Sequence, residues 1–366
     1  MYPQQHLNTP THSAPSSPVS SINSDNIVDP VIHIEDLYVD HVRKVNISKK
    51  EDKSNNNNNT KTHTALHGLN LDIYEGERIA LIGMNGGGKT SLFETLALAQ
   101  VTPINGQVSI NGIDLVSQSS LIGEKGILGY VPQMGGLFDF LTVDQTLSLF
   151  YDVKASSKYG TMISVDDFGI GILPNKYWGY PVHSLSGGNK KKLAVVAASM
   201  FTPDVILLDE PTSGVDPVAS EKIISYLNDL QSVKCMLFSS HRVSECMSLC
   251  NRVVILNDGG IFLEGPISAF GDLASRFYQV DITITSFNME NVLESIVSLS
   301  GGLNNIERIV QYTPTLVRMT YEKKLIAQSK IWGSLLMLQN DGLIASFSFR
   351  IMDMEETLSS IISSKQ

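Results

Sequence analysis

The sequence has few cysteines and no excess of basic residues. Only three cysteines occur in 366 residues, at Cys235, Cys246 and Cys250, and this small odd number cannot form a disulfide framework. The formal net charge is −10, with 27 Lys and Arg against 37 Asp and Glu, so the chain lacks the positive surface that bulk nucleic-acid binding requires. We therefore exclude a disulfide-stabilised miniprotein and expect no nucleic-acid partner.

The sequence also lacks a hydrophobic run long enough to cross a membrane. A spanning helix needs about 18 or more apolar residues, and the longest candidate, residues 193–201, covers only about half a bilayer. The start at Met1 shows no charged segment followed by an apolar one, as a secretory leader would. We expect a cytoplasmic protein that reaches a membrane, if at all, through a partner subunit.

Two polar segments stand apart from the rest. Residues 1–30 are crowded with Ser, Pro, Asn, Thr and Gln, which is typical of a disordered tail. Residues 43–63 contain KKEDKSNNNNNTK and separate two strand-like runs, so they are interpreted as a surface loop insertion. A solvated linker is the simplest role for it, with phosphorylation or partner binding as alternatives.

Between residues 31 and 275, short apolar strands alternate with segments of helical length. RIALIG, VILLD and KCMLFSS are such strands, and this order predicts an α/β domain with a mainly parallel sheet covered on both faces. Residues 276–366 change to a strand, helix, strand, strand, helix, strand order, which predicts a small ferredoxin-like α+β domain. No catalytic group of residues is visible in it, so we expect a structural or regulatory role.

Residues 83–90 read GMNGGGKT, directly after a strand and before a helix-compatible run, and match the phosphate-loop pattern. The glycines let backbone amides surround an anion, Lys89 reaches the terminal phosphates, and Thr90 offers a hydroxyl to Mg²⁺. A plain glycine-rich turn is the alternative. The residues expected at the nucleotide here are Gly83, Met84, Asn85, Gly86, Gly87, Gly88, Lys89, Thr90 and Ser91.

VILLDEP at residues 205–211 is an apolar strand that ends in two carboxylates. Its end should lie beside the phosphate loop, which places Asp209 to hold Mg²⁺ and Glu210 to orient or deprotonate an attacking water. His241 follows another apolar strand, although a lone histidine is often a bystander, and Gln133 in GYVPQ is uninformative alone. Cys246 and Cys250 share a helical face but are interpreted as small packing residues rather than metal ligands.

The segment LSGGNKKKL at residues 185–193 decides which class of nucleotide-binding protein the sequence resembles. Together with GMNGGGKT, Gln133, VILLDEP, SGVDP at 213–217 and His241, in that order, it resembles the nucleotide-binding domain of ATP-binding cassette (ABC) proteins, over about residues 31–270. The Asn and lysines after the double glycine, the LFDFLTV run and the C-terminal domain look most like the A subfamily of ABC transporters. The resemblance implies a P-loop NTPase cassette with a mainly parallel sheet, an antiparallel β subdomain and a helical subdomain.

The resemblance also implies roles for single residues. Two cassettes stack head to tail in this family, so Ser186, Gly187 and Gly188 are expected to contact the γ-phosphate bound by a partner cassette. Gln133 would contact Mg²⁺ and the attacking water and begin the segment that senses a membrane partner. His241 would hold the γ-phosphate and Glu210 in register. Asp216 would link the cassettes, whereas the lysines after the glycines either add positive potential or form a solvated helix face.

The sequence departs from the family pattern at three points. Gly87 replaces the commoner alanine, which keeps the amide cradle. The aromatic ring that stacks on adenine in the family falls near His41, with Tyr38 close by, and either ring could serve. Most A-subfamily transporters carry membrane helices in the same chain, and none is found in this sequence.

The leading hypothesis is therefore a Mg²⁺-dependent ATPase subunit, with ATP and Mg²⁺ as cofactors, that pairs with a second cassette and powers separate membrane-spanning subunits. We expect it in the cytoplasm, peripheral at a membrane. A soluble ABC ATPase that acts as a mechanical or regulatory clamp is the alternative. A nucleotide-gated binding module without hydrolysis is a third, and Glu210 and His241 count against it.

Overall fold

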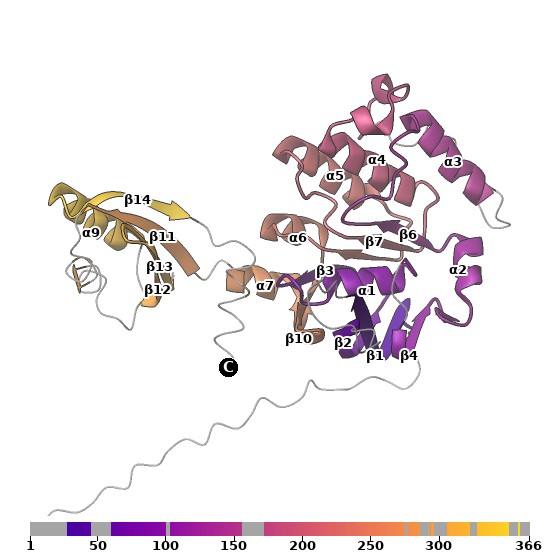
Figure 1. Ribbon diagram of the computed structural model, residues 1–366, viewed down its shortest axis with the longest axis horizontal. Helices are drawn as coiled ribbons and strands as arrows, with labels where there is room; N and C mark the ends of the chain where they lie inside the picture. The colour runs from indigo at the N-terminus through magenta and orange to yellow at the C-terminus, as the bar shows by residue number, and fades with distance from the viewer. Residues whose placement is uncertain are drawn as a thin grey trace, which may run out of the picture.

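A computed structural model describes residues 28–44, 60–99, 103–155, 172–274, 277–285, 292, 294–295, 306–322, 328–350 and 358 (Figure 1). Most of the predicted polar tail and residues 45–59 of the predicted insertion lie outside this part of the chain. We call the unit formed by residues 28–274 the main body.

The centre of the main body is a six-stranded sheet with the order β10-β9-β3-β8-β7-β6. The strands are β3 (Arg78–Gly83), β6 (Leu128–Val131), β7 (Val205–Leu208), β8 (Cys235–Phe238), β9 (Arg252–Asn257) and β10 (Gly260–Pro266). All neighbours pair in parallel except β9 and β10. The predicted mainly parallel sheet is confirmed, and β3, β7 and β8 bring their carboxyl ends to one edge.

A second, antiparallel sheet has the order β2-β1-β4-β5. It contains β1 (Ile32–Lys44), β2 (Thr60–Ile73), β4 (Pro103–Ile110) and β5 (Ile113–Asp114). The β1 and β2 pairing continues to Arg43 opposite Lys61 and Lys44 opposite Thr60. The strands thus extend into residues that the sequence analysis assigned to the loop insertion, because backbone pairing continues into its polar flanks.

Seven helices complete the described main body: α1 (Lys89–Leu96), α2 (Ser119–Lys125), α3 (Val143–Ala155), α4 (Gly187–Ser199), α5 (Pro217–Asp229), α6 (Val243–Leu249) and α7 (Ile267–Ala274). Two short 3-10 turns, η2 (Asn175–Tyr177) and η3 (Val182–Ser184), precede α4. Two of the helices begin at side-chain caps. Ser186 Oγ accepts from Asn189 N at 3.3 Å at the start of α4, and Asp216 Oδ1 accepts from Ala219 N at 2.9 Å at the start of α5.

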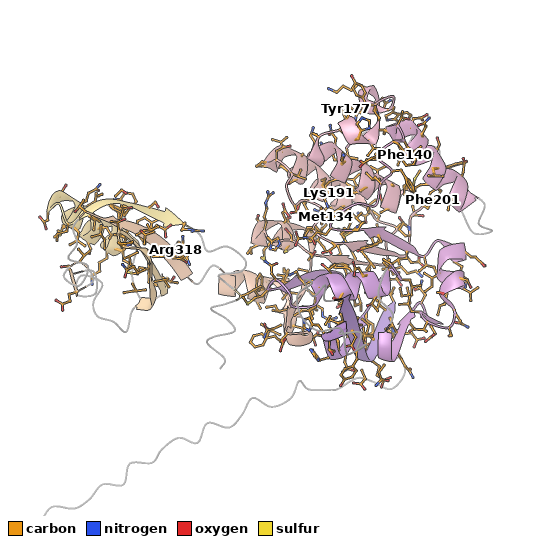
Figure 2. All side chains as sticks on the ribbon, in the orientation of Figure 1. Met134, Phe140, Tyr177, Lys191, Phe201 and Arg318 are labelled. Atoms are coloured by element: carbon orange, nitrogen blue, oxygen red, sulfur yellow. The ribbon has the colours of Figure 1, made fainter. Side chains whose placement is uncertain are left out.

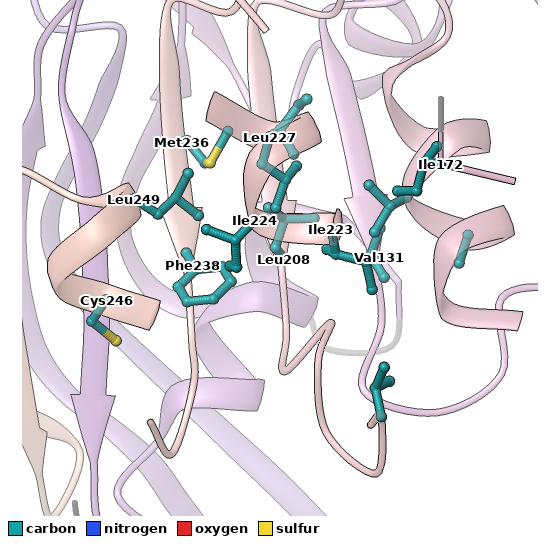
Figure 3. Packing of buried hydrophobic residues seen from close by; sticks show 14 of the residues in the cluster. Val131, Ile172, Leu208, Ile223, Ile224, Leu227, Met236, Phe238, Cys246 and Leu249 are labelled. Carbon is teal, nitrogen blue, oxygen red and sulfur yellow. The ribbon is translucent and has the colours of Figure 1, made fainter. Parts of the chain in front are cut away.

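The central sheet is buried on both faces because its strands alternate between two hydrophobic clusters. Ile206 and Leu208 face one cluster with residues of α4, α5 and α6, whereas Val205 and Leu207 face the other with α1 and the antiparallel sheet. Figure 3 shows part of the first cluster, in which Leu208 and Phe238 lie among side chains of α5 and α6. The continuous apolar runs of the sequence follow from this burial on both sides.

The C-terminal unit is a four-stranded antiparallel sheet with the order β12-β13-β11-β14. Its strands are β11 (Phe277–Ile284), β12 (Ile306–Thr313), β13 (Leu316–Glu322) and β14 (Ile344–Arg350), and α9 (Gln328–Asn340) lies between β13 and β14 in the chain. It has its own core, to which Val280, Met319 and Leu335 belong. The additional C-terminal sheet that the sequence predicts is therefore present.

Leu358 is one residue of this region that packs elsewhere. It is fully buried and belongs to the hydrophobic cluster of the main body that contains Cys246 and Phe270. The chain thus contributes to the core of the main body again after the C-terminal sheet. The sequence analysis assigned residues 276–366 to a separate domain, and the packing of Leu358 crosses that boundary.

Across the described residues, no helix combines the length and the hydropathy that a membrane crossing requires. All three cysteines are buried and free. Burial raises the pKa of the Cys250 thiol to about 12, and no metal-binding group of His, Cys, Asp and Glu occurs in the described ranges. Cys246 and Cys250 belong to the core cluster of the main body, as predicted for packing residues.

Candidate nucleotide-binding site

The phosphate loop lies between β3 and α1 and depends on glycine at specific positions. Gly86 and Gly88 adopt φ angles of +83° and +102°, which side chains strongly disfavour. A Cβ on Gly88 would lie 2.7 Å from Leu66 Cδ2, and one on Gly83 would lie 2.5 Å from the Leu256 carbonyl oxygen. The loop therefore keeps its shape only with glycine there, as expected of a backbone cradle for an anion.

Lys89 lies along this loop. Its Nζ donates to the carbonyl oxygens of Gly83 at 2.6 Å and of Met84 at 3.2 Å, and its side chain is half-buried. Met84, Asn85 and Gly86 are exposed, so the tip of the loop is open to a ligand, whereas Ser91 is buried in the first turn of α1. The ammonium is thus placed within the cradle, and weak carbonyl partners hold it until an anion offers stronger ones.

Thr90 and Asp209 meet beside the loop. Thr90 Oγ1 donates to Asp209 Oδ2 at 3.0 Å, and Ser239 Oγ donates to Asp209 Oδ1 at 2.8 Å. Burial raises the pKa of Asp209 above the usual range of a carboxyl, although these two hydrogen bonds lower it in part. A hydroxyl and a carboxylate side by side are the hard oxygen ligands that Mg²⁺ prefers, so the residues fit this ion.

Glu210 and His241 form the second pair at the same edge of the sheet. His241 Nε2 lies 2.7 Å from Glu210 Oε1, and the backbone N–H of Glu210 donates to Ser239 Oγ at 2.9 Å. Glu210 has a φ of +48°, a conformation that non-glycine residues rarely adopt. The histidine side chain is 42% exposed while the carboxylate is buried, so the pair joins the solvent side of the site to its interior.

Ser239 is the residue that sequence reasoning missed. Its hydroxyl donates to Asp209 and accepts from the backbone of Glu210, so it holds both carboxylate residues in place. The available signal is its position at the end of the apolar strand CMLFSSH, which parallel pairing of β7 and β8 brings beside VILLDEP.

Gln133 is exposed just after β6 and is held by α4 rather than by the phosphate loop. Lys191 Nζ donates to the Gln133 carbonyl at 2.7 Å, and Lys190 Nζ lies 3.2 Å from Asp139 Oδ1. Burial lowers the pKa of Lys191, although nearby Asp209 and Glu210 oppose this effect. These two lysines therefore anchor both ends of the 133–139 segment (Figure 2, Lys191 and Met134). The lysines thus do more than form a solvated helix face.

Ser186 and Gly187 are exposed at the start of α4, whereas Gly188 is buried. A Cβ on Gly188 would lie 3.3 Å from Val215 Cγ1 and 3.7 Å from Asp216 Oδ2. The double glycine thus lets the loop that carries Asp216 pack closely against α4. It also leaves the serine and the first glycine on the surface, where a second molecule can reach them.

The two aromatic candidates for adenine lie on β1. Tyr38 is partly exposed, and a Cβ on Gly68 would lie 2.9 Å from its hydroxyl, so its ring packs against β2 at this irregular point of the strand register. His41 pairs with His63 in the strand register, and its side chain lies outside the described residues.

Comparison with known families gives a direct match for this site. The family model "ABC transporter" matches residues 66–213, a range that contains the phosphate loop, the LSGG segment at the start of α4 and the carboxylates of Asp209 and Glu210. The chain carries an ABC transporter ATP-binding domain.

Several curated relatives belong to the A subfamily of ABC transporters, and the chain matches each of them over a small part of its length. The chain is 33% identical over 222 residues to "ABC transporter A family member 5" of Dictyostelium discoideum, which covers 60% of this chain and 13% of that protein. It is 34% identical to the human "ATP-binding cassette sub-family A member 2" over 57% of this chain and 9% of that protein. The chain thus corresponds to a small part of these curated relatives.

A shorter relative matches over most of its length. "ABC transporter ATP-binding protein NatA" of Bacillus subtilis is 28% identical, with 57% of this chain and 85% of that protein covered. Among solved structures, the "post-hydrolysis state of the ATP-binding cassette MJ0796 bound to ADP and Pi" has a TM-score of 0.53 at 22% identity, and covers 64% of this chain and 98% of that one. This likeness shows the ABC cassette fold.

Proposed function

We propose that this chain is an ATP-binding and ATP-hydrolysing subunit of a transporter, in which nucleotide closes a pair of ABC domains and hydrolysis reopens them. The observation that carries the proposal is the 2.7 Å contact between Glu210 Oε1 and His241 Nε2. Glu210 directly follows Asp209 in the chain, and Asp209 Oδ2 accepts from Thr90 Oγ1 at 3.0 Å. A general base next to a cation site, both beside a phosphate loop, is the arrangement that phosphoryl transfer to water needs.

Binding begins at the loop. The Lys89 ammonium exchanges the carbonyls of Gly83 and Met84 for phosphate oxygens, which carry full charge and bind it more strongly. We propose Thr90, Asp209 and Gln133 as the residues that hold Mg²⁺. When bound, this ion neutralises part of the charge on the phosphates.

Hydrolysis uses the second pair. Glu210 takes a proton from a water whose oxygen attacks the γ-phosphorus, and the bond to the bridging oxygen of ADP breaks. His241 holds the Glu210 carboxylate in a fixed orientation and extends to the solvent side, where the γ-phosphate enters. The products are ADP and inorganic phosphate.

A second ABC domain completes the proposed site. Ser186 and Gly187 lie at the surface, at a helix N-terminus that attracts anions, with Gly188 buried directly behind them. We propose that these three residues cap the γ-phosphate bound by the partner. Asp216 lies in the loop packed against Gly188 and would face the other subunit. The solved relative MJ0796 is described as dimeric with ADP and phosphate, which is consistent with this pairing.

The segment after Gln133 supplies a surface for a membrane-spanning partner. Met134 is 87% exposed and Phe140 76% exposed, and the rings of Phe138 and Phe140 lie 5.9 Å apart (Figure 2). Exposed apolar side chains in one short segment mark an interaction site. We place the protein at the cytoplasmic face of a membrane through this contact. The related cbiO1 of Clostridium perfringens is described as part of the transporter complex cbiONQ.

The domain division belongs to the same proposal. We infer a polar tail at 1–30, the ABC domain at 31–275 and a ferredoxin-like regulatory domain at 276–366. The strand order β12-β13-β11-β14, with α9 between β13 and β14, supports the last assignment.

The test of the proposed function is the variant Glu210→Gln, which keeps the shape of the side chain and removes the base. ATP turnover should collapse by about a thousandfold or more while ATP binding persists and a closed dimer accumulates on a sizing column. Undiminished Mg²⁺-dependent hydrolysis would remove Glu210 from this role. Recovery of the intact protein with an integral membrane partner supports transport, whereas recovery with ribosomes or chromatin supports the soluble clamp.

A further inference from the structure

A second buried carboxylate near the site has no part in the mechanism above. Glu245 lies in the first turn of α6 and is 7% exposed. Its Oε2 accepts from Thr212 Oγ1 and from Ser240 Oγ, both at 2.6 Å, and its Oε1 accepts from Arg242 Nη1 at 3.0 Å. A buried carboxylate without such donors would be costly, so this group is fully engaged by its neighbours.

The donors come from loops that carry proposed functional residues. Thr212 follows Glu210 by two positions, and Ser240 directly precedes His241. Ser240 Oγ also accepts from the backbone N–H of Arg242 at 3.1 Å. One carboxylate therefore anchors the chain just after the general base and just before its histidine partner.

Arg242 extends the same network to the loop that faces the partner domain. Its Nη1 also donates to Ser220 Oγ at 3.0 Å, and its Nη2 donates to the Val215 carbonyl at 3.4 Å. Val215 directly precedes Asp216, the residue that caps α5. One guanidinium therefore links the Asp216 loop to Glu245 and, through Glu245, to the His241 loop.

We propose that Glu245 and Arg242 are positioning residues that couple closure of the partner domain, sensed at Asp216, to the alignment of His241 with Glu210. This coupling rests on the proposed function. Neither side chain is assigned a contact with nucleotide; the two act through hydrogen bonds to Thr212, Ser240 and Val215. Because Glu245 and Arg242 bind each other and both loops through direct hydrogen bonds, they form the continuous contact network that coupling between two loops requires.

The experiment measures kcat and KM for ATP, together with ATP-driven dimerisation, in the full chain. Glu245→Gln keeps the volume but removes the charge that pairs with Arg242. We expect kcat to fall about 10- to 100-fold, because a small misplacement of a catalytic group has a cost of this size, while KM changes by no more than about twofold. Dimer closure on ATP should persist. Glu221→Gln, on the exposed face of α5, is the matched control and should match the parent chain.

Arg242 separates positioning from a merely structural role. Arg242→Met should reproduce the fall in kcat, Arg242→Lys should restore part of it, and Arg242→Met combined with Glu245→Gln should be no worse than either alone, since both break one path. A kcat unchanged in Glu245→Gln and Arg242→Met, or effects that add in the double variant, would overturn the coupling. If Glu245→Gln does not fold, Thr212→Ala removes one donor and should lower kcat at constant KM, and an unchanged kcat there counts against the coupling.

The control Glu210→Gln distinguishes the two levels of the argument. If Glu210→Gln hydrolyses ATP normally, the proposed function itself fails. If Glu210→Gln is inactive while Glu245→Gln is fully active, the proposed function stands and only the coupling is wrong.

Discussion

The hydroxyl of Ser239 lies 2.8 Å from the carboxylate of Asp209 and donates to it. The two residues follow adjacent parallel strands, β8 and β7, and come together because those strands end at the same edge of the sheet. This contact fixes one carboxylate oxygen of Asp209 and leaves the other to Thr90. The proposed cation site is therefore built by three separate segments of the chain.

Removing this contact should change the pH dependence of the enzyme. Burial raises the pKa of Asp209, and the Ser239 hydrogen bond opposes that rise, so Ser239→Ala should raise the pKa further. Because the ionised carboxylate is the form that binds Mg²⁺, activity falls as pH decreases through this pKa. The acid limb of kcat/KM should therefore move to higher pH in Ser239→Ala. An unmoved limb at saturating Mg²⁺ would show that Asp209 does not limit activity there.

The variant Lys89→Ala tests nucleotide binding at the phosphate loop separately from ATP hydrolysis. The ammonium loses its place among the phosphate oxygens, so ATP affinity should fall by about a hundredfold, a loss within the range of charge-assisted hydrogen bonds. Equilibrium titration with a fluorescent ATP analogue measures the effect. Lys125→Ala, exposed on α2, is the control. Unchanged ATP affinity in Lys89→Ala would place Lys89 outside the site.

Lys191→Met tests whether α4 holds the segment after Gln133. The Nζ contact with the Gln133 carbonyl is lost while most of the side-chain packing is kept. Backbone amides of residues 133–139 should exchange hydrogen faster, and kcat should fall by about tenfold because Gln133, which we propose as a Mg²⁺ ligand, loses the contact that holds it. Mass-detected exchange gives the first quantity and steady-state kinetics the second. If the exchange rate of this segment stays at the parent value, Lys191 does not anchor it.

The sequence predicts those parts of the site that are continuous along the chain. GMNGGGKT directly follows the buried strand RIALI and VILLDEP begins with a buried strand, so the local pattern carries both the fold and the chemistry. Ser239 and Glu245 escaped because their roles depend on partners about 30 residues away, which no local pattern encodes. The lysines Lys190 and Lys191 were left open for the same reason, since their carboxylate and carbonyl partners lie 51 and 58 residues away along the chain.

The domain boundary shows the same limit. The change of pattern near residue 276 predicts a separate C-terminal sheet, and the structure contains one. A single leucine near the end of the chain carries no signal of its own, however, and Leu358 joins the core of the main body. Hydrophobic periodicity identifies that a residue is buried but not which core receives it.

Leu358→Ala tests this packing. Truncating a fully buried leucine costs about 2–5 kcal/mol, and the cost should fall on the main body rather than on the C-terminal sheet. The two tryptophans separate these bodies, because Trp178 packs against the main-body cluster whereas Trp332 lies on α9 and stacks on Phe349. Urea unfolding of a Trp332→Phe background therefore reports the main body alone, and its midpoint should fall.

Leu336→Ala, which removes an exposed leucine of α9, is the control and should change the free energy of unfolding of the main body, followed at Trp178, by no more than about 0.5 kcal/mol. A Trp178 midpoint that is unchanged in Leu358→Ala would mean that this leucine does not belong to the main-body core.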